Sequence, residues 1–315
     1  MPLPVTPDQI RAAYERLRGH ALRTPLLPLG LTQGADVTFK LELVQHAGSF
    51  KTRGAFNTLL SRTVPPAGVT AASGGNHGVA VALAAAALGH SATIFVPEIA
   101  SPVKIEAIRR HGAEVVVGGA RYADAQAACD AHAGVTGALL VHPYDAVETL
   151  AGQGTVAAEW EHDQAALGLG PLDTVLVACG GGGLVAGMAA WWAGRVRVVA
   201  VEPEGSRCLH AALEAGEPLD VPVESVAADS LGARRVGTLP FAVAQAAIDR
   251  VVLVTDTAIR SAQAQLWRDW RIASEPGGAA AFAALASGAY LPAAGERVGV
   301  LLCGGNVDPA VLATL

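Results

Sequence analysis

Short runs of Val, Ile and Leu alternate along almost the whole chain with longer stretches of helical character, and this alternation constrains the fold most. Runs of this length and composition predict buried β-strands. The strand candidates are VTFKLEL, GVTAAS, SATIFVP, AEVVVGG, DTVLVACG, RVRVVAVEP, RVVLVTD and RVGVLLCGG. Repeated strand–helix–strand units favour parallel sheets with helices on both faces, so we predict an α/β fold that binds ligands at the carboxyl ends of its strands.

The composition indicates a globular protein that acts on small molecules. The chain has 315 residues, of which 51 % are apolar and 16 % are charged, and this length suggests about two domains. It carries 22 basic and 28 acidic residues and a net charge of −6. Because no basic run or aromatic stripe offers a nucleic acid a binding surface, we expect no nucleic-acid partner and a small-molecule substrate.

Three features bear on the cellular compartment. The first 19 residues lack the apolar core of a signal peptide. The uncharged stretch from Thr174 to Gly194 is long enough to suggest a membrane helix, but four glycines interrupt it, which favours a strand, a loop and a helix instead. No CxxC pair occurs among Cys129, Cys179, Cys208 and Cys303, which read as reduced thiols. We expect a cytoplasmic protein with no membrane partner.

Four consecutive glycines, Gly180 to Gly183, lie between the apolar run VLVAC and a helical segment that begins at Leu184. Glycines let backbone N–H groups approach phosphate oxygens closely, and the start of a helix adds unpaired N–H groups and a positive dipole end. A tight turn would need only one or two glycines. The pattern therefore favours a phosphate site, although it matches neither the dinucleotide nor the nucleoside triphosphate fingerprint.

Three further segments combine polar residues with glycines at strand or helix ends. In GSFKTRGA, Lys51 follows Phe50 at a predicted helix start, where the dipole and desolvation would lower its pKa toward the amine that forms Schiff bases. In SGGNHG, Ser73, Asn76 and loop amides after a strand could hold a carboxylate. CGGN places Cys303 after the last strand candidate. Taken singly, these residues could equally be a surface lysine, a helix cap and a buried inert thiol.

Together these segments resemble the threonine/serine dehydratase and serine racemase family, within the tryptophan-synthase-β-like, fold type II pyridoxal-phosphate enzymes. The family's lysine signature, asparagine loop, phosphate loop and C-terminal loop correspond, in this order, to SFKTRGA, SGGNHG, GGGGL and CGGN. Further family segments are HPYD at 142–145, AGQGT at 151–155, VEPEG at 201–205 and EPGGAA at 275–280. The resemblance spans nearly the whole chain.

The resemblance implies an architecture of two open, twisted, mostly parallel sheets flanked by helices. Residues 1–69 and 146–315 would form a large domain that binds the cofactor. Residues 70–145 would form a small inserted domain that carries the asparagine loop. The family is commonly dimeric, so the resemblance also implies a homodimer.

The resemblance further assigns pyridoxal 5′-phosphate as the cofactor and gives each motif a role. Lys51 would bind the cofactor as a Schiff base, Phe50 would lie against its ring, Asn76 would bond its phenolic oxygen, and Cys303 would face its pyridine nitrogen. The cofactor's phosphate would be held by Gly180, Gly181, Gly182, Gly183 and Leu184. The substrate carboxylate would be received by Ser73, Gly75, Asn76 and His77.

The implied reaction removes water and ammonia from a β-hydroxy amino acid such as L-threonine or L-serine and leaves a 2-oxo acid. A neutral thiol at Cys303 cannot keep the pyridine nitrogen protonated, as an aspartate does in other pyridoxal enzymes, and this disfavours long-lived carbanions. Lys51, released when the substrate takes its place, would remove the α-proton, and loss of the β-hydroxyl would follow at once. These features favour elimination.

A divalent cation site, which many family members carry, is in doubt in this chain. Cys208 stands six residues after Glu202, where relatives have a carboxylate. A hard cation prefers oxygen ligands to a thiol. Only Glu202 and the carbonyl of Ser206 would remain as partial ligands.

Other functions compete with dehydration of threonine or serine. A serine or hydroxyaspartate racemase/dehydratase, or a dehydratase of a bulkier substrate such as phenylserine, is the nearest alternative. Racemisation needs a second acid–base group opposite Lys51, which in serine racemases is a serine at the position of Gly74; Gly74→Ser is therefore expected to introduce some racemase activity. Sulfhydrylases, non-catalytic phosphate binders and nucleotide-dependent oxidoreductases fit the lysine and asparagine segments less well.

Overall fold

The large sheet of this computed structural model, which describes residues 3–32, 34–100 and 102–312, has six described strands in the order β1-β2-β10-β7-β8-β9. Among these strands, β1 alone runs antiparallel to its neighbour. The strands are β1 (Leu26–Thr32), β2 (Ala35–Lys40), β7 (Thr174–Ala178), β8 (Arg197–Pro203), β9 (Arg250–Val254) and β10 (Arg297–Leu301).

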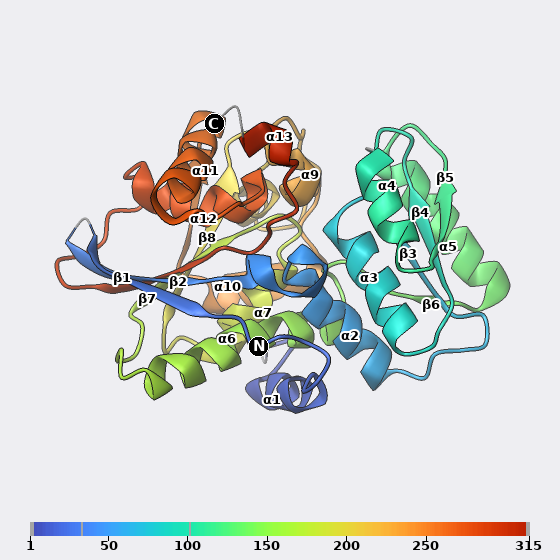
Figure 1. The fold of residues 1–315 in the computed structure, drawn as a ribbon, viewed down its shortest axis with the longest axis horizontal. Helices are drawn as coiled ribbons and strands as arrows, with labels where there is room; N and C mark the ends of the chain where they lie inside the picture. Colours follow the sequence, from blue (N-terminus) through green and yellow to red (C-terminus); the bar gives the residue numbers. More distant parts are fainter. Residues whose placement is uncertain (1–2, 33, 101, 313–315) are drawn as a thin grey trace.

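A second sheet lies beside the first and is formed by the middle of the chain (Figure 1). Its described strands follow the order β5-β4-β3-β6 and are all parallel. They are β3 (Val69–Ala72), β4 (Ala92–Val96), β5 (Glu114–Val117) and β6 (Leu139–Leu140). Two mostly parallel sheets with flanking helices confirm the predicted fold class.

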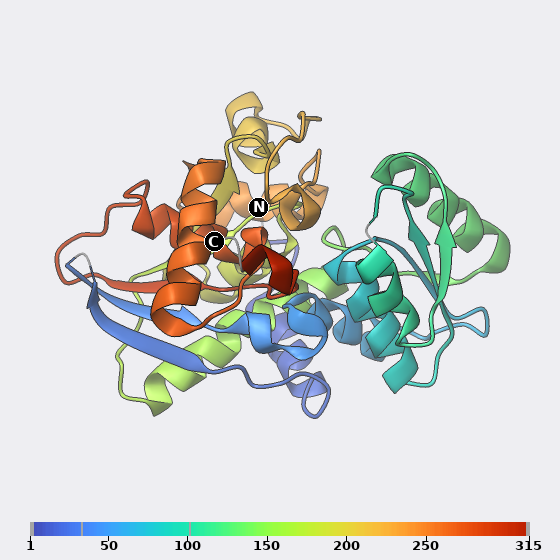
Figure 2. The ribbon, with the colours of Figure 1, turned by 45° about the horizontal axis from the view of Figure 1, so that its top comes forward.

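Helices cover both faces of both sheets (Figures 1 and 2). The large sheet is flanked on one face by α6 (Val147–Ala166), α7 (Gly183–Trp192), α10 (Thr238–Ala247) and α1 (Pro7–Arg16), and on the other by α11 (Asp256–Trp270) and α12 (Pro276–Ala286). The small sheet packs against α3 (Asn76–Ala87), α4 (Pro102–Arg109) and α5 (Tyr122–Thr136). The remaining helices are α2 (Lys51–Ser61), α8 (Cys208–Ala215), α9 (Ala228–Leu231), α13 (Pro309–Leu312) and the 3₁₀ turns η1 (Glu42–Val44) and η2 (His46–Gly48).

All eight strand candidates are strands in the structure, and β1 and β6 were missed. β1 lies at the sheet edge and contains Pro28 and Gly30, which break the apolar alternation and coincide with an irregularity in its pairing with β2. β6 has only two residues. The uncharged stretch at 174–194 forms β7, a loop and α7, as expected. Within the described ranges no helix is long and apolar enough to cross a membrane.

The hydrophobic core follows the two sheets. One cluster of buried side chains lies around the large sheet and includes Trp160, Met188 and Trp192. A second cluster joins the small sheet to α2 through Phe56 and Leu59. Because α2 contributes to the core of the small sheet while it also packs along α6, the domain boundaries at residues 70 and 145 stay a prediction.

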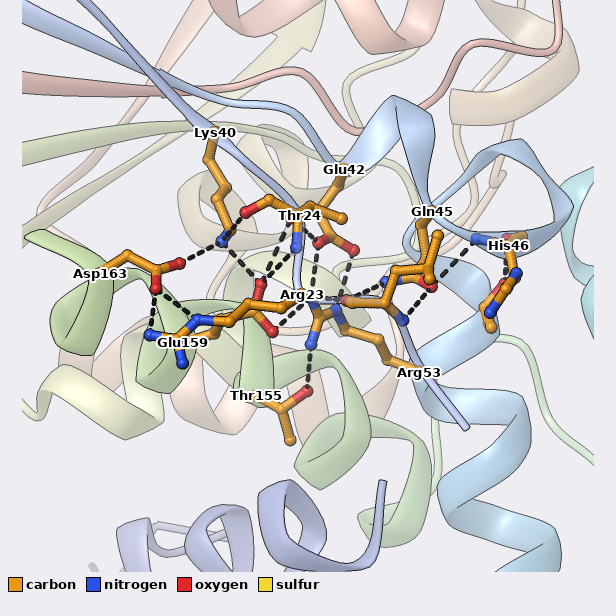
Figure 3. Close-up of polar contacts among 12 residues, drawn as sticks. Arg23, Thr24, Lys40, Glu42, Gln45, His46, Arg53, Thr155, Glu159 and Asp163 are labelled. Carbon is orange, nitrogen blue, oxygen red and sulfur yellow. Dashed lines mark hydrogen bonds and ion pairs between the residues drawn. The ribbon is translucent and has the colours of Figure 1, made fainter. Parts of the chain in front are cut away.

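A cluster of buried charges fixes the start of α2 (Figure 3). The guanidinium of Arg53 donates to both carboxylate oxygens of Glu42, at 2.9 and 2.6 Å, and to Glu159 on α6 at 3.0 Å. Lys40 on β2 donates to Glu159 at 2.7 Å and to Asp163 at 3.1 Å. Lys40, Glu42 and Arg53 are at most 1 % exposed.

These buried ions depend on one another, because removing any of them leaves an opposite charge without a partner away from water. Burial by itself would raise the pKa of Glu42, but the charge of Arg53 and its hydrogen bonds lower that pKa below the ordinary value. The carboxylate therefore stays ionised. The cluster joins β2, α2 and α6, and so holds in place the helix that begins with Lys51.

We predict that Arg53→Met lowers the free energy of unfolding by about 3–5 kcal/mol, because it strands the Glu42 carboxylate in the interior. Arg62→Met is the matched control near the other end of α2, where Arg62 pairs with Glu148 at 2.9 Å and is 55 % exposed; it should cost at most about 1 kcal/mol. Urea unfolding followed by circular dichroism measures both. Equal effects of the two substitutions would contradict the anchoring role of Arg53.

Candidate active site

A cavity lies where the carboxyl ends of β7 and β10 approach the start of α2. It is lined by Phe50 and Lys51, the glycine loop Gly180–Gly183, Leu184 and Cys303, whose roles toward a cofactor stay predictions. The rest of its lining consists of Tyr144, Ala178, Cys179, Ser230 and Leu231. Segments that are far apart in the chain therefore form one site.

The glycine loop has no room for side chains. A Cβ at Gly181 would collide with the ring of Tyr144, and one at Gly183 would lie 2.8 Å from the Tyr144 Cα. A Cβ at Gly180 would lie 3.0 Å from the Leu231 Cα, and Gly182 has a positive φ of 91°. All four glycines are thus required. Because no side chain caps the start of α7, its first N–H groups are available to an anion.

Lys51 is the first residue of α2 and is half-buried. Its Nζ donates to the carbonyl of Pro143 at 2.8 Å and lies 5.2 Å from the centre of the Phe50 ring. Burial lowers the pKa of Lys51 to about 8. The amine is therefore neutral in a substantial fraction of molecules near neutral pH, and a neutral amine is the nucleophilic form.

Asn76 begins α3, and its side chain reaches across to the large sheet. Its Nδ2 donates to Glu275 at 2.6 Å, and its Oδ1 accepts from Asn306 at 2.8 Å. Ser73 stays within its own loop, where its hydroxyl accepts from the N–H of Gly75 at 3.2 Å. Within the predicted asparagine loop, the Asn76 side chain is thus hydrogen-bonded to the loop that follows Cys303.

The His77 side chain is hydrogen-bonded to the residue that follows β6. Its Nε2 lies 2.8 Å from the carbonyl of Val141, within the small sheet's packing. Burial, reinforced by the charge of Lys51, lowers the pKa of His77 to about 3. The imidazole is therefore neutral, and any contact of His77 with an anion would come through its backbone N–H at the start of α3.

A family model described as pyridoxal-phosphate dependent enzyme matches residues 17–304. The chain belongs to this family. It is 40 % identical over 288 residues to the phenylserine dehydratase of Ralstonia pickettii, covering 89 % of this chain and 86 % of that protein. It is 36 % identical over 307 residues to the L-threonine ammonia-lyase of Geobacter sulfurreducens, covering 95 % and 75 %.

Solved structures of related enzymes have the same fold. The maize serine racemase is 32 % identical and superposes with a TM-score of 0.91, covering 98 % of this chain and 96 % of its own. The processed threonine deaminase isoform 2 of Solanum lycopersicum is 29 % identical, with a TM-score of 0.89 and coverage of 98 % and 92 %. The chain is thus a fold type II pyridoxal-phosphate enzyme.

The cavity fits this cofactor. The glycine loop and the uncapped start of α7 suit a phosphate, and the Lys51 amine lies in the same cavity. Cys303, which lines the same cavity, is buried, and burial together with the Glu275 carboxylate raises its pKa above the ordinary value. The thiol is therefore neutral, which is the state that the sequence analysis assumed when it contrasted Cys303 with the aspartate of other pyridoxal enzymes.

Sequence reasoning gave no role to several residues of the site, among them Tyr144, Glu275 and Asn306. Tyr144 packs against the glycine loop, and Glu275 and Asn306 hold Asn76. The segments that contain them, HPYD, EPGGAA and CGGN, were matched to family segments, but the matches gave no role to Tyr144, Glu275 or Asn306. The signal for Glu275 is a carboxylate directly before Pro276 at a predicted helix start. Burial raises the pKa of this carboxyl to about 7, against the hydrogen bond from Asn76 and the charge of Lys104.

The doubtful cation ligands lie behind the glycine loop. Both carboxylate oxygens of Glu202 accept backbone N–H groups at the start of α8, from Leu209 at 2.9 Å and His210 at 2.8 Å. The Cys208 thiol donates to the Gly180 carbonyl at 3.3 Å. Across the part of the chain that is described, no group of His, Cys, Asp and Glu is arranged to hold a metal. A weakened cation site at Glu202 and Ser206 stays a prediction.

We predict that Gly181→Ala weakens pyridoxal-phosphate binding by about 5- to 150-fold, because the methyl group meets the Tyr144 ring and overpacking costs about 1–3 kcal/mol. Cofactor absorbance of the purified protein measures it. Gly134→Ala is the control: position 134 lies within α5 with nothing near an added Cβ, so binding should not change. Full cofactor content in Gly181→Ala would contradict the proposed phosphate site.

A second prediction concerns the charge of Lys51. Since its pKa is lowered to about 8, the rate at which the apoenzyme takes up pyridoxal phosphate should rise with pH through a midpoint near 8, as the neutral amine forms. Stopped-flow absorbance between pH 6 and about 10.5 measures this rate. N-acetyl-lysine methylamide, with an ordinary amine pKa of about 10.4, corrects for titration of the cofactor. The prediction is wrong if the pH midpoint of the uptake rate for the apoenzyme equals that measured with N-acetyl-lysine methylamide.

Proposed function

We propose that the chain uses pyridoxal phosphate to remove water and ammonia from a β-hydroxy amino acid such as L-threonine or L-serine, which yields a 2-oxo acid. One observation carries the proposal: the lowered-pKa amine of Lys51, the glycine loop and the neutral thiol of Cys303 line a single cavity. The relatives named phenylserine dehydratase and L-threonine ammonia-lyase support the same reaction class.

Lys51 would act as the base. Bound pyridoxal phosphate supplies an electron-withdrawing ring that acidifies the substrate's α-proton. The Lys51 Nζ, whose pKa is lowered to about 8 by burial, would accept that proton, since a base with a pKa near the working pH transfers protons efficiently. Its hydrogen bond to the Pro143 carbonyl gives the amine a defined position.

Cys303 would direct the reaction toward elimination. As a neutral thiol it places no negative charge near the ring nitrogen, unlike an aspartate partner. Electron density that develops at the α-carbon is then stored poorly in the ring. Prompt departure of the β-hydroxyl relieves this, so dehydration is favoured over reactions that need a long-lived carbanion.

The start of α3 would receive the substrate carboxylate. The first turn of a helix presents free N–H groups and a positive dipole end, and no side chain caps α3. We assign Ser73, Gly75, Asn76 and His77 to this contact, with His77 acting through its backbone because its imidazole is turned toward Val141. A homodimer in the cytoplasm, as the family resemblance implies, completes the proposal.

The geometry argues against introducing racemisation by Gly74→Ser. A Cβ at Gly74 would lie 2.8 Å from the Ala100 Cβ and 3.0 Å from the Val96 Cγ1. A serine side chain would therefore be directed into the packing of the small sheet. The expectation that this substitution adds racemase activity is not supported by these contacts, and we retain dehydration from the L-enantiomers as the proposed activity.

The purified holoenzyme should release equal amounts of 2-oxo acid and ammonia from at least one of L-threonine, L-serine and L-threo-phenylserine. Phenylserine belongs in this panel because of the relative that carries its name. Lys51→Ala should give no detectable product while circular dichroism shows an unchanged fold, because the proposed base is lost. Turnover by Lys51→Ala at the wild-type rate would refute the role of Lys51.

Incubation of the holoenzyme with L-serine in deuterated water separates dehydration from racemisation. We expect pyruvate and no deuterated D-serine in the recovered substrate, as judged by chiral chromatography and mass spectrometry. Appreciable deuterated D-serine would instead identify a racemase, with a second acid–base group opposite Lys51.

A further inference from the structure

A chain of three polar side chains spans the junction of the two sheets. Asn76 at the start of α3 donates to Glu275, the residue before α12, at 2.6 Å. Asn306, which follows β10, donates to Asn76 at 2.8 Å. Asn76 belongs to the small sheet's side of the cavity, whereas Glu275 and Asn306 belong to the large sheet's side. No role in the reaction has been assigned above to Glu275 or Asn306.

The hydrogen bonds among these three side chains favour one orientation of the Asn76 amide. The Asn306 Nδ2 donates to the backbone carbonyl of Ala47 and to the Asn76 Oδ1, both at 2.8 Å. An amide NH₂ group has two hydrogens, so both are used. Because the Ala47 carbonyl only accepts, reversal of Asn306 would set its oxygen against that carbonyl whichever way the Asn76 amide lies. Asn76 must therefore present its oxygen to Asn306.

Glu275 completes the constraint from the other side. Its Oε1 accepts from the Asn76 NH₂ group and is buried, with the residue 3 % exposed. With Glu275 ionised, as it is above its raised pKa of about 7, reversal of the Asn76 amide would set its oxygen against this carboxylate and leave a buried acceptor unsatisfied. The contacts of Asn306 and Glu275 therefore favour the same orientation of the Asn76 amide.

We infer that Glu275 and Asn306 are positioning residues that hold the Asn76 amide with its NH₂ group toward Glu275 and one N–H free to donate to an oxygen of the bound cofactor. The Asn76 Nδ2 lies beside the loop that carries Cys303: a Cβ at Gly304, the next residue, would be 3.4 Å from it. The inference rests on the proposed cofactor site and not on the choice of substrate.

Three variants test this arrangement. Glu275→Leu removes the acceptor while keeping most of the volume, and Glu275→Gln keeps an acceptor oxygen without the charge. Asn306→Asp replaces a donor by an acceptor, so it repels the Asn76 oxygen and favours the reversed amide. Asn306 is exposed, so this last change should leave the fold intact. Circular dichroism and thermal unfolding verify folding of each protein.

The readouts are the absorption spectrum of the holoenzyme and its rate of cofactor loss on dilution, both measured without substrate. We expect Glu275→Leu and Asn306→Asp to lose pyridoxal phosphate about tenfold faster, the effect of one lost hydrogen bond, with a shifted absorption maximum. Glu275→Gln should stay within about threefold of wild type, which corresponds to less than ~1 kcal/mol.

Two results would overturn the inference. One is a wild-type spectrum and release rate in folded Asn306→Asp, which decides the matter even if Glu275→Leu does not fold. The other is a loss in Glu275→Gln as large as in Glu275→Leu, since charge and not orientation would then matter. Absence of catalytic turnover in the wild-type protein would count against the proposed function alone, because these readouts need only bound cofactor.

Discussion

The buried ion pairs of Arg53 with Glu42 and Glu159 are the interaction on which the placement of the site depends. Two residues before Arg53, Lys51 begins α2 with its amine inside the cavity, and α2 is the element that packs against both the large sheet's helices and the small sheet's core. Charged groups that are removed from water are stable only when each is paired with an opposite charge and hydrogen-bonded. The cluster therefore ties β2, α2 and α6 together in one arrangement, and the position of Lys51 follows from it.

Around Lys51 the protein keeps its titratable groups neutral or poised near neutrality by removing them from water. Burial lowers the pKa of Lys51 to about 8 and that of His77 to about 3, and it raises the pKa of Cys303. In the proposed function, a phosphate and a carboxylate are bound by backbone N–H groups at the starts of α7 and α3. Such a site can hold two anionic groups and still contain a neutral amine to move a proton.

Much of the fold and part of the site could be predicted because they depend on local pattern. Parallel strands buried on both faces appear as continuous apolar runs, and the eight runs became strands; β1 was missed because Pro28 and Gly30 interrupt it at an exposed edge, and β6 because two residues make no pattern. Phe50, Lys51, the glycine loop and Cys303 line one cavity because each follows a strand or lies at the start of a helix. Tyr144, Glu275 and Asn306 could not be given roles, since their functions lie in contacts with residues tens to hundreds of positions away.

The sequence by itself determined the fold class and the residue types at the ends of the strands, because apolar periodicity and glycine-rich turns are encoded within a few neighbouring positions. The cofactor followed from the resemblance of four short segments to a known enzyme family. Only the tertiary structure decided which atoms of those residues are available to a bound cofactor or substrate. The His77 ring is hydrogen-bonded to the Val141 carbonyl, Gly181 must lack a side chain because Tyr144 covers it, and the Asn76 amide is held between Asn306 and Glu275. The physical reason is that burial and hydrogen-bond satisfaction are properties of the assembled neighbourhood.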